Sequence, residues 1–138
     1  MQSSQEYQDQ LLKFRYLKEQ NDMFRNQLEL INASLGNVLN TKNTVENLKE
    51  GVNEGDEILV PIGGLVHIKA DIKETKKVLL AVTQDVVIEK DLDSTIEFLE
   101  NLIEQHNKQI QFLRQQLQAL EGNLQEVSQL LQRNYLQK

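Results

Sequence analysis

The two histidines, His67 and His106, are the side chains of this sequence best suited to bind a metal or to transfer a proton near neutral pH. No spacing around either of them matches a known set of zinc ligands. The chain has no Cys, which excludes a disulfide, a thiolate metal site and a thiol nucleophile. We therefore expect no metal site: His67 should lie on the polar face of a strand, and His106 should be a polar residue that sets helix register.

Other catalytic patterns are missing as well. The sequence contains no Walker A motif, no GxGxxG and no GxSxG. The pair Gly63-Gly64 is typical of a turn, and Glu97 and Glu100 fit an ordinary solvated helix face. We therefore expect no enzyme activity and no cofactor.

Composition narrows the class of protein further. The 138 residues carry a net charge of −6, and this acidic balance argues against general nucleic-acid binding, which needs Lys and Arg to neutralise phosphates. No apolar run reaches the roughly 18 residues of a membrane span, and the N-terminal sequence MQSSQEYQDQ does not resemble a signal peptide. We expect a soluble, cytoplasmic protein with no nucleic-acid or membrane partner.

Two segments, 1–50 and 94–138, repeat apolar residues with the heptad spacing of a coiled coil. Apolar side chains fill 19 of 24 inward positions, where a 39% apolar content predicts roughly nine. In the first segment, position a is Tyr7, Phe14, Asn21, Leu28, Leu35 and Lys42, and position d is Gln10, Leu17, Phe24, Ile31, Val38 and Val45. In the second, position a is Ile96, Ile103, Ile110, Leu117, Leu124 and Leu131, and position d is Leu99, His106, Leu113, Leu120, Val127 and Asn134.

The two predicted helices have nearly equal lengths, which favours a chain that turns back into an antiparallel coiled coil. Facing residues would then have numbers that sum to about 143, so that Leu28 lies near Gln115 and Phe14 near Gln129. A parallel dimer of straight helices is the alternative, but the segment 51–93 would interrupt its seam. The sequence Ser94-Thr95-Ile96-Glu97 matches a capping box and predicts the start of the second helix at Ser94.

The segment 51–93 predicts four strands, near Glu57–Val60, Leu65–Asp71, Val78–Thr83 and Val86–Lys90. The run from Val78 to Val82 is apolar on both faces, and one small hairpin cannot bury both. Isolated hairpins are marginal in water and open edges invite pairing. We therefore expect these strands to complete a sheet or barrel with other subunits. The fold class is mainly α with a small β part, in a single domain of residues 1–138.

Apolar residues outside the seam gather near both ends of the chain: Leu11, Leu12, Tyr16, Leu130, Tyr135 and Leu136. Antiparallel pairing would bring the two groups to one tip, and exposed apolar patches usually mark interaction sites. The alternative is that they extend the local core or that the tip frays.

The middle of the sequence resembles the prefoldin family. The segments that carry the resemblance are Ile58-Leu59-Val60-Pro61-Ile62-Gly63, His67–Ile72, Val78–Val82 and Val86–Lys90. Two hairpins fit the archaeal-type alpha class. The turn Thr83-Gln84-Asp85 departs from the glycine that is common there, which leaves a filament-forming gamma-type member as an alternative.

The resemblance implies an ATP-independent holding chaperone in which two alpha and four beta subunits form a hexamer around a double β-barrel. Coiled-coil tips would bind non-native client proteins and deliver them to a group II chaperonin. The expected client contacts are Leu11, Leu12, Phe14, Tyr16, Leu17, Leu124, Val127, Leu130, Leu131, Tyr135 and Leu136. The expected assembly residues are Ile58, Val60, Val66, Ile68, Leu80, Val82, Val86 and Ile88. A structural scaffold or filament subunit is the competing function.

Overall fold

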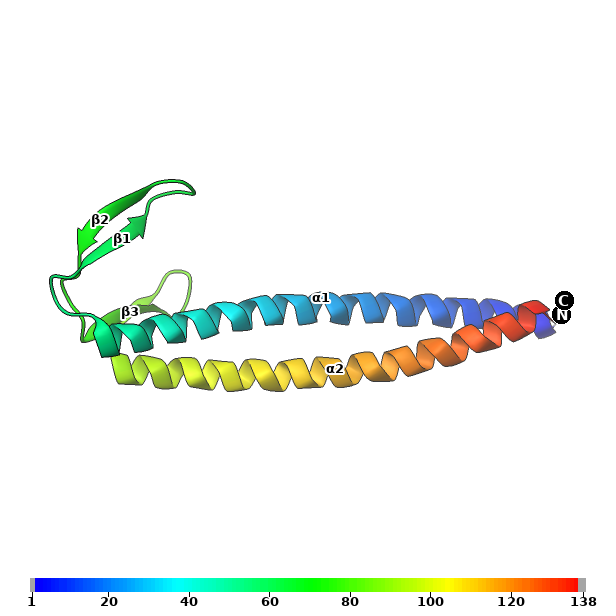
Figure 1. Cartoon of the computed structure of the whole chain (residues 1–138). Helices are drawn as coiled ribbons and strands as arrows, with labels where there is room; N and C mark the ends of the chain where they lie inside the picture. The colour runs from blue at the N-terminus through cyan, green and yellow to red at the C-terminus, as the bar shows by residue number, and fades with distance from the viewer. Residues whose placement is uncertain (1, 137–138) are drawn as a thin grey trace. The chain divides into compact units, whose positions relative to one another are not determined.

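A computed structural model describes residues 2–136 of the chain. Helix α1 spans Gln2–Gly51 and helix α2 spans Leu92–Leu136, with strands β1 (Glu57–Pro61), β2 (His67–Asp71), β3 (Lys77–Ala81) and β4 (Val87–Asp91) between them (Figure 1). The predicted order of helix, four short strands and helix is confirmed. The chain divides into two compact units. We call residues 1–35 with 105–138 the terminal unit, and residues 36–104 the central unit.

The heptad pattern correctly predicts which side of each helix is buried. All 24 predicted a and d residues are buried or half-buried, including the polar residues Gln10, Lys42 and Asn134. The lowest exposures in the seam are those of Leu99 and Val127, at 3% each. Burial of this apolar stripe is the main favourable term in the stability of a two-helix coil.

Three polar contacts establish antiparallel pairing in the terminal unit. Asn134 Nδ2 donates to Gln10 Oε1 at 2.7 Å, and Ser34 Oγ lies 2.9 Å from His106 Nε2. An ion pair joins Arg25 to Glu121 at 3.0 Å. The numbers of these paired residues sum to between 140 and 146, close to the predicted 143. The pairing excludes the parallel dimer of straight helices, in which these contacts within one chain would not form.

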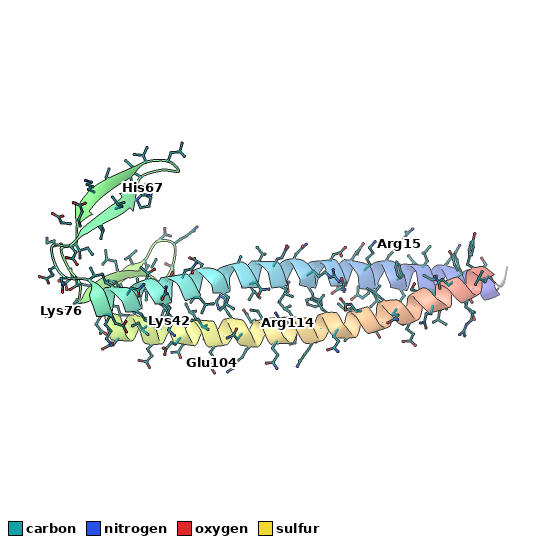
Figure 2. All side chains as sticks on the ribbon, viewed as in Figure 1. Arg15, Lys42, His67, Lys76, Glu104 and Arg114 are labelled. Carbon is teal, nitrogen blue, oxygen red and sulfur yellow. The ribbon has the colours of Figure 1, made fainter. Side chains whose placement is uncertain are left out.

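Polar residues interrupt the seam at defined levels. Asn21 is only 6% exposed, and its Nδ2 atom has no hydrogen-bond partner among residues 2–136. In the central unit, Lys42 (Figure 2) pairs with Glu100 at 3.4 Å and with Glu46 at 3.6 Å. Unlike the Asn21 amide, the Lys42 ammonium group therefore has partners, the carboxylates of Glu46 and Glu100. Such residues lower stability and favour one register, because a shifted register would bury them elsewhere.

The central unit has its own small core. Val45 of α1 packs with Leu92 and Leu99 of α2, and Val78 of β3 lies against this cluster. Lys49 Nζ donates to Asp93 Oδ1 at 2.6 Å, and this hydrogen bond, with the charge of Asp93, raises the pKa of Lys49. The second hairpin is therefore anchored to the helices at its root.

The predicted start of the second helix is wrong by two residues, and the predicted cap is wrong as well. Helix α2 begins at Leu92, directly after β4. The Asp91 carboxylate accepts hydrogen bonds from the Ser94 N–H at 2.7 Å and from the Ser94 hydroxyl at 2.9 Å. Asp91 is thus the N-cap, and Ser94 is the third helical residue that it binds. The Asp91 carboxylate, at the end of β4, caps the N-terminus of α2. The helix therefore starts before the capping box at Ser94.

Each hairpin is a separate antiparallel pair. In the first, Val60 lies opposite Ile68, and in the second Leu80 lies opposite Ile88. The strand bounds match the prediction to within two residues, and Val66, Val82 and Val86 fall just outside them. The predicted half-burial of β2 is only partly seen, because Ile68 is 47% exposed and only Ala70 of that strand is half-buried.

The hydrogen bonds at Thr83 explain how the chain forms this turn without the glycine that is common there. Val82 N–H donates to Val86 O at 3.0 Å, and the Thr83 hydroxyl accepts from the Val86 N–H at 3.1 Å. No non-glycine residue among residues 2–136 has a positive φ. The hydroxyl closes the turn without a left-handed residue, whereas the first hairpin uses Gly63 with φ 148°.

Replacing the buried amide of Asn21 should stabilise the coil. In Asn21→Leu, an unpaired polar group is exchanged for an apolar side chain in the seam, and the free energy of unfolding should rise by about 1–3 kcal/mol. Thermal unfolding followed by circular dichroism measures this change. Asn26→Leu, on the exposed side of the same helix, is the control and should have little effect. An unchanged or lower melting temperature for Asn21→Leu would show that the amide is satisfied in solution.

Removing the α2 cap should destabilise the protein in a pH-dependent way. The hydrogen bonds from the Ser94 N–H and hydroxyl lower the pKa of Asp91 below its usual value near 3.8. Its contribution is therefore fully present above that pH and is lost as the pH falls through the lowered value. The difference in melting temperature between wild type and Asp91→Ala should be constant from pH 7 to about 5 and should shrink in stronger acid. Asp91→Asn, which does not titrate, should show no such change; a pH-independent deficit in Asp91→Ala would contradict the assignment.

Candidate interaction surfaces

The end of the terminal unit where residues 7–17 of α1 lie beside residues 124–136 of α2 is here called the tip. It contains every residue predicted to contact clients, but in three different environments. Leu17 and Val127 are buried in the seam. Half-buried residues are Leu11, Phe14, Leu124, Leu130 and Leu131. The exposed residues are Leu12 at 63%, Tyr16 at 61%, Tyr135 at 71% and Leu136 at 82%.

An open groove of about 540 Å³ lies at the tip. Its lining includes Phe14 and Leu131, at a positions of the heptad, and its exposed apolar part is Tyr135 and Leu136. Sequence reasoning missed three of its lining residues, which are Tyr7, Ser128 and Gln132. The helical wheel could have identified them, because positions a, b and e of both helices lie on the same side of the coil.

Charged residues limit this apolar groove to the tip. The adjacent groove on the same side, of about 440 Å³, includes Lys18, Asp22 and Arg25. Beyond it, another groove includes the ion-paired residues Arg25 and Glu121. On this side, the apolar groove is therefore confined to the first turns of α1 and the last turns of α2.

Each hairpin has an apolar face that is largely exposed, and the opposite face also carries exposed apolar residues, which are Leu59 on the first hairpin and Leu79 and Val87 on the second. On the first hairpin, Ile58, Val60 and Ile68 alternate with the charged residues Glu57 and Lys69, so the apolar residues share a face. Val66 and Val82 continue the two faces into the turns, with exposures of 54% and 41%. On the second hairpin, the corresponding strand residues are Leu80 and Ile88, and Val86 lies just before β4 on the same face. Of the eight predicted assembly residues, only Val60 and Leu80 are half-buried.

The two histidines lie in different environments. His67 lies exposed on β2 (Figure 2), and His106 lies half-buried against Ser34. Within residues 2–136, no three His, Cys, Asp or Glu side chains gather in a way that could hold a metal ion. No helix in that range is long and apolar enough to cross a membrane.

Comparison with known proteins identifies the family. The family model described as "Prefoldin subunit" matches residues 17–137. The chain belongs to the prefoldin family. The prefoldin alpha subunits of Pyrococcus horikoshii and Methanobrevibacter smithii are 29% and 28% identical to it, over 95% of this chain and 88% and 84% of their own lengths.

The prefoldin fold is seen in a solved structure too. The cryo-EM structure of filamentous PFD from Methanocaldococcus jannaschii has a TM-score of 0.72 to this chain at 20% identity, over 83% of this chain and 93% of that one. The alpha-subunit relatives and the two hairpins assign this prefoldin chain to the archaeal-type alpha class. Prefoldin is a family of chaperone subunits rather than of enzymes.

Proposed function

We propose that this chain is a subunit of an ATP-independent holding chaperone that binds unfolded protein at the coiled-coil tip. The observation that carries the proposal is the open apolar groove at the tip, flanked by Tyr135 and Leu136. In an unfolded client, apolar side chains that are buried in the native state are exposed to water, and an open groove can cover some of them. The sequence contains no nucleotide-binding motif, which agrees with ATP-independent holding of client proteins.

Weak contacts at the tip become useful when several tips act together. One open groove offers little area and no deep pocket, so the affinity of a single tip for a client is low. Several coiled coils joined in one oligomer raise the effective concentration of each tip near a bound client. The proposed oligomer contains two alpha and four beta subunits, works in the cytoplasm and passes its client to a group II chaperonin.

The hairpins supply the proposed assembly surface. Their apolar faces are exposed in the isolated chain, and strands β1 to β4 pair only within their own hairpins among the described residues. Such faces and open edges are stable when neighbouring subunits cover them. We infer that the hairpins of several subunits together close a β-barrel.

A filament-forming scaffold is the second candidate, favoured by the structural similarity to a filamentous PFD. The two functions make different demands on the chain. A scaffold needs the hairpin surfaces and leaves the tip without a role, whereas a holding chaperone needs both. The first experiment below separates them.

Making the tip polar should abolish holding. The triple variant Leu12→Ser, Tyr135→Ser, Leu136→Ser changes only exposed residues, so its melting temperature should stay close to that of wild type. Assembled with a prefoldin beta subunit, it should lose most of the wild-type suppression of aggregation of heat-unfolded citrate synthase, measured by light scattering. Leu39→Ser, an exposed apolar residue of the central unit, is the matched control. Full suppression by the triple variant would leave the scaffold function as the better account.

Placing charges on the hairpin faces should prevent assembly. In Ile68→Lys with Ile88→Lys, each new ammonium group would lie in an apolar subunit contact, where its desolvation is costly. Native mass spectrometry with a beta subunit should then show separate subunits where wild type forms an oligomer. Lys69→Gln with Glu89→Gln, on the opposite faces of the same strands, should assemble normally. Oligomers of unchanged mass in the lysine variant would refute the assembly surface.

A further inference from the structure

The two sides of the terminal unit differ in charge. In an antiparallel pair of helices, e positions face each other on one side and g positions on the other, with c beside g and b beside e. The ion pair between Arg25 and Glu121 joins two e positions, and Ser34, at a g position, contacts the seam residue His106 on the other side. These two contacts therefore fix which residues lie on which side.

The g and c side carries no charge over a long stretch. In residues 16–34 and 105–123, none of the twelve g and c residues is charged, whereas eight of the sixteen b, e and f residues are. Arg114 (Figure 2) is one of those charged residues. We call the g and c side of this stretch the neutral flank; its residues are Tyr16, Gln20, Met23, Gln27, Leu30, Ser34, Gln105, Gln109, Phe112, Gln116, Ala119 and Asn123.

Large apolar side chains project from the neutral flank at regular intervals. Tyr16, Met23 and Leu30 occupy three successive c positions and are 61%, 43% and 72% exposed. Phe112 of α2 is 56% exposed. It lies at the same level of the coil as Leu30, because the residue numbers 30 and 112 sum to 142 and those of the observed pairs sum to between 140 and 146. Successive c positions are about 10 Å apart along the helix. The seam does not need these side chains, because the a and d residues already fill it.

The polar residues between them indicate the kind of partner. Glutamine, asparagine and serine side chains both donate and accept hydrogen bonds without a charge. They can therefore pair with the free N–H and C=O groups of an extended chain, groups that a folded helix satisfies internally. A charged partner would lose hydration against this flank and find no counter-charge there.

The small apolar area argues against a permanent partner such as a second copy of the chain. A stable interface buries roughly 800 Å² on each side, and four separated side chains supply much less apolar area than such an interface requires. They suit a weak and reversible contact. Tyr16 also belongs to the tip, so the neutral flank begins at the tip, but the groove there lies on the other side of the coil, and Glu126, a c residue of α2, lies near the level of Tyr16.

We propose that the neutral flank is a second client-holding surface, which binds extended, uncharged segments of a non-native polypeptide already held at the tip. This inference rests on the proposed function. From Tyr16 to Leu30 the flank is about 21 Å long, which accommodates roughly six or seven residues of extended chain. Below the tip groove, the charged b and e side of the coil binds no client. Clients with long neutral segments are held more tightly than clients of similar size whose segments are interrupted by charge.

Charges placed on either side of the coil test this surface. Met23→Glu, Leu30→Glu and Phe112→Glu together place three carboxylates on the neutral flank. Asn32→Glu, Gln111→Glu and Gln118→Glu add the same charge on the other side, at exposed positions. Glutamate favours helix, so both variants should keep the helical circular dichroism of wild type. In oligomers with a beta subunit, the first variant should release unfolded citrate synthase several-fold faster than wild type, and the second should match wild type.

Site-specific photo-crosslinking gives an independent measurement. A photoreactive residue at Gln27, on the neutral flank, should link to unfolded citrate synthase, and one at Gln118 should not. Equal labelling at both positions, or linkage of Gln27 to another prefoldin chain instead of the client, would overturn the inference. The serine variant of the tip is measured in the same assay. If it loses client and the neutral-flank variant does not, only the inference fails; if neither loses client, the proposed function fails.

Discussion

The antiparallel seam between the two helices is the constraint on which the other features depend. A coil of two helices has one buried stripe, and here the a and d residues of both helices occupy it. Asn21 reduces the stability of this stripe while favouring its register. The paired contacts from Gln10 with Asn134 to Lys49 with Asp93 show that one register holds within each of the two units.

Because the seam uses few positions, most side chains remain in water and can take on other roles. The surfaces of the terminal unit differ in charge. The tip groove is apolar, the b and e side next to this groove is charged, and the g and c side of residues 16–34 and 105–123 is neutral. A globular domain of this size would bury much of that surface in its core. The two-helix fold instead leaves most of its side chains at the surface, where they are available for contacts with other molecules.

The sequence allowed prediction of the features that follow from periodicity. Heptad spacing correctly predicted the buried face of both helices, and alternation located the strands to within two residues. Competition between local signals was harder to resolve: Asp91 and Ser94 are both good caps, and only the end of β4 at Asp91 decides between them. The groove lined by Tyr7 and Gln132 depends on how two helices pack, which no single run of sequence contains.

The junction between β4 and α2 has a mechanical consequence. Strand and helix meet at Asp91 and Leu92 with no residue between them, and Leu92 N–H also donates to Lys76 O just before β3. Five residues, by contrast, separate α1 from β1. A force applied to the second hairpin therefore reaches α2 without an intervening loop, whereas a force on the first hairpin reaches α1 through a connection held by hydrogen bonds such as that from Gly55 N–H to Ile72 O. The second hairpin is thus coupled to its helix more directly than the first hairpin is to α1.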